Sequence, residues 1–203
     1  MGAGTTAGGS ARAAGEAMRA LLRLRVALRG EDLAAISALE ALRDELGAAD
    51  LAALSRETVW EIEIAGDAPV MARALERLQS AARESLLFAN PVKERWTLEE
   101  GPLRLGRAGV GRCLVGLLVR DRPDRAGPAC ARALATDWEI AGAAVRRDTL
   151  WILDLPDTGR DAAAARARAL GVTTARRSGL LVNPHYQDWE IVLEDVVNDA
   201  RAV

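Results

Sequence analysis

The segments LLFANPVKERWTL (86–98) and GLLVNPHYQDWEI (179–191) share an apolar run, an Asn-Pro pair and a Trp in the same order. The matched residues stand 93 positions apart: Asn90 and Asn183, Pro91 and Pro184, Trp96 and Trp189. A second pair, TVWEIEI (58–64) and TLWILDL (149–155), places Trp60 and Trp151 91 positions apart. Similar offsets at separate places in one chain predict a tandem duplication.

The stretches around these segments extend the match. The alternating run at 21–29 predicts a half-buried strand, and with the 91-residue offset Leu24, Val26 and Leu28 fall on Val115, Leu117 and Val119. Apolar residues at helical spacing predict a helix over 31–50, with Gly47 as its C-terminal stop. A strand at 59–64 follows, and then a helix that starts near Asp67 and Pro69 and continues to Leu86. The turn at Asn90-Pro91 leads to a strand around Arg95, Thr97 and Leu98.

The same order returns after a Gly-rich stretch. A strand is expected at 112–120, a helix at 123–137, a strand at 143–155, a helical region at 159–179 and a closing strand at 183–194. The sequence therefore predicts a flexible tail (1–17), a first repeat (18–100), a linker (101–112), a second repeat (113–195) and a C-terminal tail (196–203). Each Asn, at the end of a helix, is expected to take the left-handed conformation before Pro stops the helix.

These elements indicate the α+β class, with two tandem β-α-β-α-β repeats and antiparallel sheets. A unit of three strands leaves its sheet edges unpaired, so the two repeats are expected to pair with each other about a pseudo-twofold axis.

Composition narrows the function classes. The 203 residues carry 27 Lys and Arg against 29 Asp and Glu, a formal charge of -2, which gives no basic excess for nucleic-acid binding. The apolar runs are far shorter than a membrane span of about 20 residues. Cys113 and Cys130 form no CxxC pair and are interpreted as buried small side chains, which favours a reduced, cytoplasmic setting.

No residue pattern predicts a catalytic site, a cofactor site or a metal site. GRAGVGR (106–112) precedes a strand, whereas a dinucleotide fingerprint needs a strand, glycines and then a helix. The repeated Trp residues could form a binding surface, but their place in alternating strands favours packing. His185 and Arg146 are candidate interface positions, and Arg146, Arg147 and Asp148 are expected on a solvated face.

The two Asn-Pro segments resemble the small subunit of phosphoribosylformylglycinamidine synthase, the PurS family. The residues that carry the resemblance are Leu86, Leu87, Ala89, Asn90, Pro91 and Val92 in the first repeat, and Leu180, Leu181, Asn183, Pro184, Asp188 and Glu190 in the second. Val145 and Arg146 match the central strand of the family, whose Gly-Lys pair is replaced here by Glu57-Thr58 and Asp148-Thr149.

The resemblance implies a ferredoxin-like, non-catalytic subunit that joins a glutaminase subunit to an ATP-dependent synthetase subunit in purine biosynthesis and helps ammonia pass between them. The tandem chain is similar to a fused PurS dimer, and further self-association is left open. Because the Gly-Lys pair of the family is replaced, a second hypothesis stays open. In this alternative the chain is a diverged ferredoxin-like regulatory module that binds a small metabolite between its repeats.

Overall fold

Local signals in the sequence set the boundaries of several elements in the computed structural model, which describes residues 18–175 and 178–193. The elements are β1 (Met18–Leu28), α1 (Leu33–Leu46), β2 (Ala53–Gly66), α2 (Ala68–Glu84), β3 (Glu94–Glu100), β4 (Arg112–Asp121), α3 (Ala126–Asp137), β5 (Ala144–Pro156), α4 (Arg160–Gly171) and β6 (Gln187–Leu193). The expected tails at 1–17 and 196–203 lie outside the described residues.

The observed helix ends confirm the predicted start of α2 and the predicted end of α1, and they correct the predicted end of α4. Asp67 caps α2 by accepting a hydrogen bond from the Val70 amide, with Pro69 in the first turn, and Gly47 ends α1 at φ 62°. The expected helical region at 159–179 is wrong in its second half, because α4 ends at Gly171. The chain then folds back, and the Thr173 amide donates to the carbonyl oxygen of Val182.

The six strands form one antiparallel sheet in the order β3-β1-β2-β5-β4-β6. This confirms the α+β class with an antiparallel sheet. The central pair joins β2 of the N-terminal half (18–100) to β5 of the C-terminal half (112–193), with Thr58 opposite Thr149. These two residues are also the equivalent first residues of the two Trp-containing segments. Outward from this central pair, equivalent strands follow in the same order on both sides: β2, β1 and β3 on one side, and β5, β4 and β6 on the other.

One expected correspondence is wrong by two residues. Leu24 lies opposite Trp60 and Leu98, whereas the residue opposite Trp151 and Ile191 is Leu117. The first strands are therefore offset by 93 positions, so that Leu22, Leu24 and Val26 correspond to Val115, Leu117 and Val119. An alternating strand pattern repeats every two residues and could not distinguish the two alignments.

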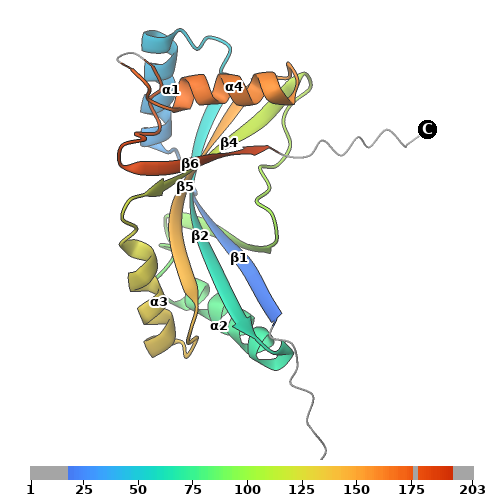
Figure 1. Cartoon of the computed structure of the whole chain (residues 1–203), viewed down its shortest axis with the longest axis vertical. Coiled ribbons are helices and arrows are strands. Elements are labelled where there is room, and N and C mark those ends of the chain that lie inside the picture. The colour runs from blue at the N-terminus through green and yellow to red at the C-terminus, as the bar shows by residue number, and fades with distance from the viewer. Residues whose placement is uncertain (1–17, 176–177, 194–203) are drawn as a thin grey trace, which may run out of the picture.

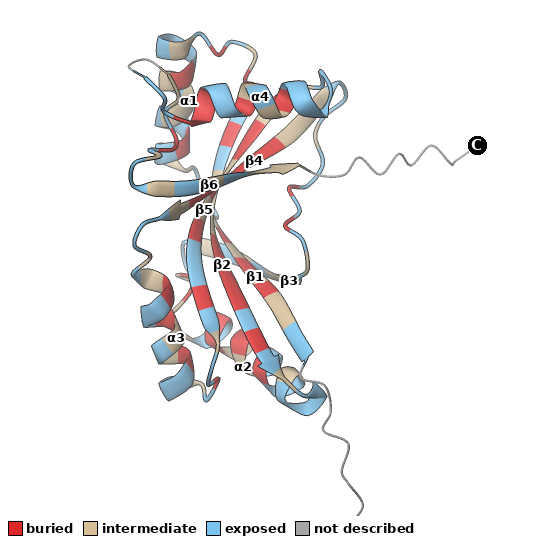
Figure 2. Ribbon diagram, in the orientation of Figure 1, coloured by how far each residue is buried: buried red, intermediate tan, exposed pale blue. Residues whose placement is uncertain are grey.

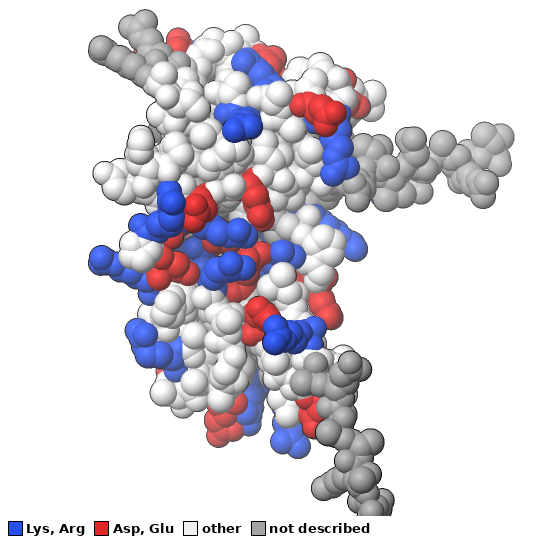
Figure 3. All heavy atoms as spheres, viewed as in Figure 1, with Lys and Arg blue, Asp and Glu red and all other residues white. Residues whose placement is uncertain are grey.

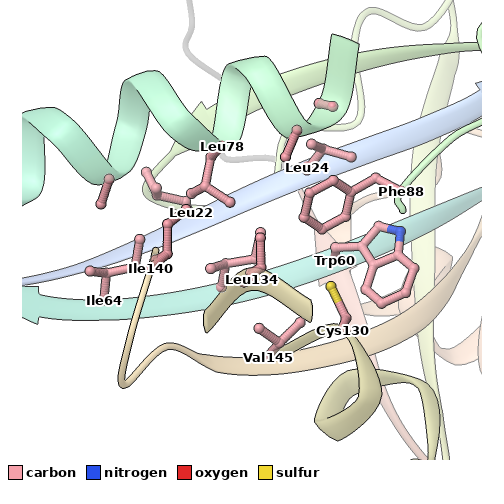
Figure 4. Packing of buried hydrophobic residues seen from close by; sticks show 14 of the residues in the cluster. Leu22, Leu24, Trp60, Ile64, Leu78, Phe88, Cys130, Leu134, Ile140 and Val145 are labelled. Carbon is pink, nitrogen blue, oxygen red and sulfur yellow. The ribbon is translucent and has the colours of Figure 1, made fainter. Parts of the chain in front are cut away.

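All four helices cover one face of the sheet, here called the helical face. The first hydrophobic cluster joins α2 of the N-terminal half to α3 of the C-terminal half, through residues such as Leu78 and Leu134 (Figure 4). The second joins α1 to α4, through Leu42 and Leu170. Figure 1 shows the two helix pairs at opposite ends of the twisted sheet. Each half therefore lends one helix to the core of the other.

The opposite face of the sheet, here called the open face, is crossed by residues 101–111, here called the strap. Leu103 and Leu105 are buried against a cluster of strand residues: Val59, Leu118, Leu150 and Ile152, with Leu114 and Val192 at its margin. Gly116 makes room for this contact, since a Cβ there would lie 2.9 Å from Leu105 Cδ2. The expected linker is thus a packed part of the core, and Figure 2 shows buried positions along it and the strands beneath.

Candidate functional site

A buried carboxylate lies in the middle of the open face. Glu61, in β2, is 3% exposed and lies opposite Arg23 on one side and Arg146 on the other. Its Oε1 accepts a hydrogen bond from Arg23 Nε at 2.9 Å, and its Oε2 lies 3.2 Å from Arg146 and 3.3 Å from Arg120. Three arginines from three strands and both halves therefore converge on one side chain.

Asp148 is the second buried carboxylate of this site. It is 3% exposed and accepts a hydrogen bond from Arg120 Nε at 3.0 Å. Burial raises the pKa of Asp148 from 3.8 to about 6, because desolvation outweighs the attraction of Arg120, and the nearby Glu61 acts in the same direction as burial. Arg120 also reaches Glu190 at 3.2 Å, so one guanidinium connects three carboxylates.

We name this group, Arg23, Glu61, Arg120, Arg146 and Asp148, the Glu61 cluster. Its members come from β1, β2, β4 and β5, and it crosses the junction between the two halves. Charged side chains gather across the waist of the molecule in Figure 3. The buried carboxylates are matched by arginines within the cluster, so the group forms a fixed ion-pair network. Arg146, whose side chain is 60% exposed, is the member that a partner molecule can reach.

A shallow pocket lies beside the cluster, towards the edge of the N-terminal half. Its volume is about 190 Å³, and it is lined by Arg25, Ala27, Glu57, Arg95, Trp96, Thr97 and Glu99. Arg25 Nε donates to Glu57 Oε2 at 2.7 Å across its floor. The pocket therefore presents cationic and anionic groups side by side.

The Trp residues that sequence analysis singled out take part in packing. Trp60 is 7% exposed and meets Phe88 edge-on with ring centroids 5.5 Å apart (Figure 4), whereas Trp151 is half-buried. The guanidinium of Arg147 lies 5.6 Å from the Trp60 ring, and that of Arg56 lies 5.6 Å from the Trp151 ring. Each contact joins one half to the other, and Arg56 and Arg147 are themselves 91 residues apart.

The edge-strand Trp residues are half-buried. Trp96 packs against the first cluster and Trp189 against the second, where Arg168 lies 5.2 Å from its ring. Packing therefore explains Trp60, which is buried. It explains only part of Trp96, Trp151 and Trp189, whose side chains are half-buried.

The Asn-Pro segments form matching turns. Asn90 Oδ1 accepts from the Val92 amide and Asn183 Oδ1 from the His185 amide, both at 3.1 Å. Neither Asn takes the left-handed conformation that the sequence suggested, because each initiates an Asx turn instead of ending a helix. Pro91 and Pro184 occupy the next position, and a side chain at the start of the following strand closes each turn, Glu94 or Gln187.

The two candidate interface residues lie apart in the structure. Arg146 belongs to the Glu61 cluster and has a side chain that is 60% exposed, while His185 is exposed in the turn before β6. Arg147 is exposed, as expected, but Asp148 is buried, so the expectation of a solvated Arg146–Asp148 face is wrong for Asp148. Alternation along β5 turns Asp148 to the same side as Arg146, where side chains from the neighbouring strands, among them Arg120, surround it.

Sequence reasoning missed Glu61, Arg23 and Arg120. One signal was present: Glu61 is the position at which the two Trp-containing segments differ in type, with Ile152 as its counterpart. A charge in the middle of a strand whose counterpart is apolar marks a place where the two halves differ.

Both cysteines are free thiols. Cys130 is buried, and burial raises its pKa to about 12, while the half-buried Cys113 thiol also has a raised pKa. In the part of the chain that the structure describes, no three His, Cys, Asp or Glu side chains come together in a way that would hold a metal ion. None of the described helices is long enough and apolar enough to span a membrane.

Comparisons with protein-family models, with curated proteins and with solved structures gave no match.

Proposed function

We propose that this chain is a fused, PurS-like pair of ferredoxin-like repeats that acts as a non-catalytic bridging subunit of phosphoribosylformylglycinamidine synthase. In this role it joins the glutaminase and the ATP-dependent synthetase subunits and supports ammonia transfer between them. The observation that carries the proposal is the β2–β5 junction, where Thr58 lies opposite Thr149 and the two β-α-β-α-β halves exchange helices.

The matching Asn-Pro turns add support, because they are the segments on which the resemblance to the family rests. In both halves the turn uses the same Asx contact and leads directly into an edge strand. The duplication places these turns on opposite sides of the junction, which suits a subunit that holds two other chains.

A fused pair also offers what a symmetric homodimer lacks. The open face carries the Glu61 cluster near its centre and the pocket near the β3 edge, whereas Leu103 and Leu105 of the strap cover apolar strand positions such as Leu118 and Leu150. The strap also reaches the charged positions, since the Gly101 and Arg104 carbonyl oxygens accept from Arg23 and Arg25. Two different partners can therefore be distinguished by one chain.

The test is reconstitution with the glutaminase and synthetase subunits of the same organism, followed by light scattering and by glutamine-dependent amidation. A complex of defined mass and a gain in glutamine-dependent activity are expected. Arg146→Ala should weaken the complex, whereas Arg132→Ala, on an exposed part of α3, should not. Absence of both complex and activity gain would overturn the proposal.

The pocket favours one second candidate, a regulatory module for a small zwitterionic metabolite. The alternative expected a metabolite between the repeats, whereas the residues that line this pocket all belong to the N-terminal half. Arg25 and Arg95 could face its carboxylate, and Glu57 and Glu99 its ammonium group. A thermal-shift screen of amino acids and nucleotides tests this, since a ligand at 100 times its dissociation constant stabilises a protein by about 2.7 kcal/mol. A shift that Arg95→Ala abolishes would support the module, and no shift with any compound would reject it.

A further inference from the structure

The strand β3 has one free edge. It pairs with β1 and ends the sheet, and no other strand in the described ranges lies beyond it. The Arg29 amide donates to the Lys93 carbonyl oxygen, and the Gly101 amide donates to that of Leu21. Odd-numbered residues of β3 therefore bond to β1, so the amide and carbonyl groups of Trp96, Leu98 and Glu100 point outward. Those of Glu94 are bonded within the chain, since its amide donates to the Asn90 carbonyl oxygen and its carbonyl oxygen accepts from Arg29 Nε.

The sequence of β3, ERWTLEE, is self-complementary about Thr97. In an antiparallel pair of two such strands with Thr97 opposite Thr97, Arg95 faces Glu99 twice on the open face. Trp96 faces Leu98 twice on the helical face. This register also pairs even-numbered residues with even-numbered residues, as the outward backbone groups require. We propose that β3 pairs in this way with β3 of a second copy of the chain and extends the sheet into a homodimer.

Two side chains in β3 lack the contacts that such a dimer would supply. The Arg95 side chain is exposed and forms no ion pair or hydrogen bond with any described residue. Glu99 Oε2 is a buried atom without a hydrogen bond, and the nearest guanidinium nitrogen, Arg25 Nη1, lies 4.0 Å away. The Glu99 side chain as a whole is 35% exposed, so Arg95 of the second copy would donate to the accessible part of the carboxylate, while the buried Oε2 stays beside Arg25.

The ends of the paired strands bring Glu94 of one copy opposite Glu100 of the other. The Glu94 carboxylate already accepts a hydrogen bond from the Asn90 amide at 2.6 Å, which turns its charge towards its own chain. The unfavourable pair is thus confined to the ends, while both favourable charge pairs lie near the centre.

The opposite edge strand, β6, lacks this complementarity. The residue that corresponds to Thr97 is Glu190, and self-pairing about it would bring two like charges together at the twofold axis. Asp188 and Val192 correspond to Arg95 and Glu99, and they cannot form an ion pair. Only β3 is therefore suited to self-pairing, which closes a dimer and does not propagate into a filament.

Charge reversal tests the pairing. Sedimentation velocity over a wide concentration range should show a reversible monomer–dimer equilibrium for the full chain. Arg95→Glu places like charges opposite each other at two sites and should weaken dimerisation by about tenfold or more. The double variant Arg95→Glu/Glu99→Arg restores both pairs and should regain most of that loss. Asp188→Arg, at the corresponding position of β6, should change nothing.

A crosslink tests the register. Thr97 would oppose its own copy in a non-hydrogen-bonded pair with Cα atoms about 4.5 Å apart, which a disulfide can span. With Cys113 replaced by Ser, Thr97→Cys should form a covalent dimer on mild oxidation, and Arg95→Glu should suppress it. Glu190→Cys should not crosslink. A strictly monomeric chain, a double variant without recovery, or crosslinking through position 190 would each overturn the proposal.

Discussion

The two halves share one backbone plan but present different open faces. In the N-terminal half the strand positions on this face carry Arg23, Arg25 and Glu61, whereas the corresponding C-terminal positions carry Gly116, Leu118 and Ile152. The charged positions form ion pairs, and the apolar positions are covered by Leu103 and Leu105 of the strap. The two halves are therefore alike on the helical face, which carries the two clusters that pack the helices, and differ on the open face.

The largest expected effect distinguishes the two central Trp residues. Trp60→Ala should lower the free energy of unfolding by about 3–5 kcal/mol, because the ring is buried against Phe88 in the first cluster. Trp151→Ala, the matched change in the other half, should cost clearly less, since that ring is half-buried. Urea denaturation of both variants measures the contrast, and equal losses would show that the two halves pack alike.

The next effect concerns the charged face. Glu61→Ala should cost about 3 kcal/mol, because it leaves Arg23 and Arg120 without their shared carboxylate in a poorly solvated place. Glu63→Ala is the control on the same strand and face, where an exposed pair with Arg19 is worth little. If chemical denaturation showed the two variants to be equally stable, the Glu61 cluster would not hold the halves together.

The apolar face gives a smaller effect. Leu105→Ala should destabilise the chain by about 2 kcal/mol, since Leu105 is 6% exposed and fills the space above Gly116. Val110→Ala changes a fully exposed side chain of the same segment and should be neutral. Differential scanning calorimetry can compare the two variants. If Leu105→Ala left the stability unchanged, the strap would contribute no packing energy, as the sequence-based expectation of a linker implies.

The last comparison is a pH dependence that belongs to Asp148. Because its pKa is raised from 3.8 to about 6, the folded chain holds a proton more tightly than the unfolded chain. Its contribution to stability therefore rises as pH falls through this window and is lost as pH rises through about 6. The difference in unfolding free energy between the parent and Asp148→Asn should follow this trend. Asp188→Asn, at an exposed carboxylate, is the control, and parallel curves for the parent and Asp148→Asn would refute the assignment.

Much of the local structure could be predicted from short-range patterns. Hydrophobic periodicity gave the order of strands and helices in both halves, and Asp67, Pro69 and Gly47 gave helix ends, because capping depends on neighbouring residues only. The helical reading failed after Gly171, where contacts with residues 180–182 direct the chain. The candidate site was found only in part, since Arg146 was named but Glu61, Arg23 and Arg120 were not.

The sequence by itself determined the two β-α-β-α-β series, the matched Asn-Pro turns and the antiparallel class, since periodicity, turn chemistry and internal similarity are local properties. Tertiary structure alone decided the exchange of helices between halves, the 93-residue alignment of the first strands, the burial of Glu61 and Asp148, and the packing of the strap. Each of these depends on which strand lies beside which, and side chains separated by dozens of residues meet only when the sheet has formed.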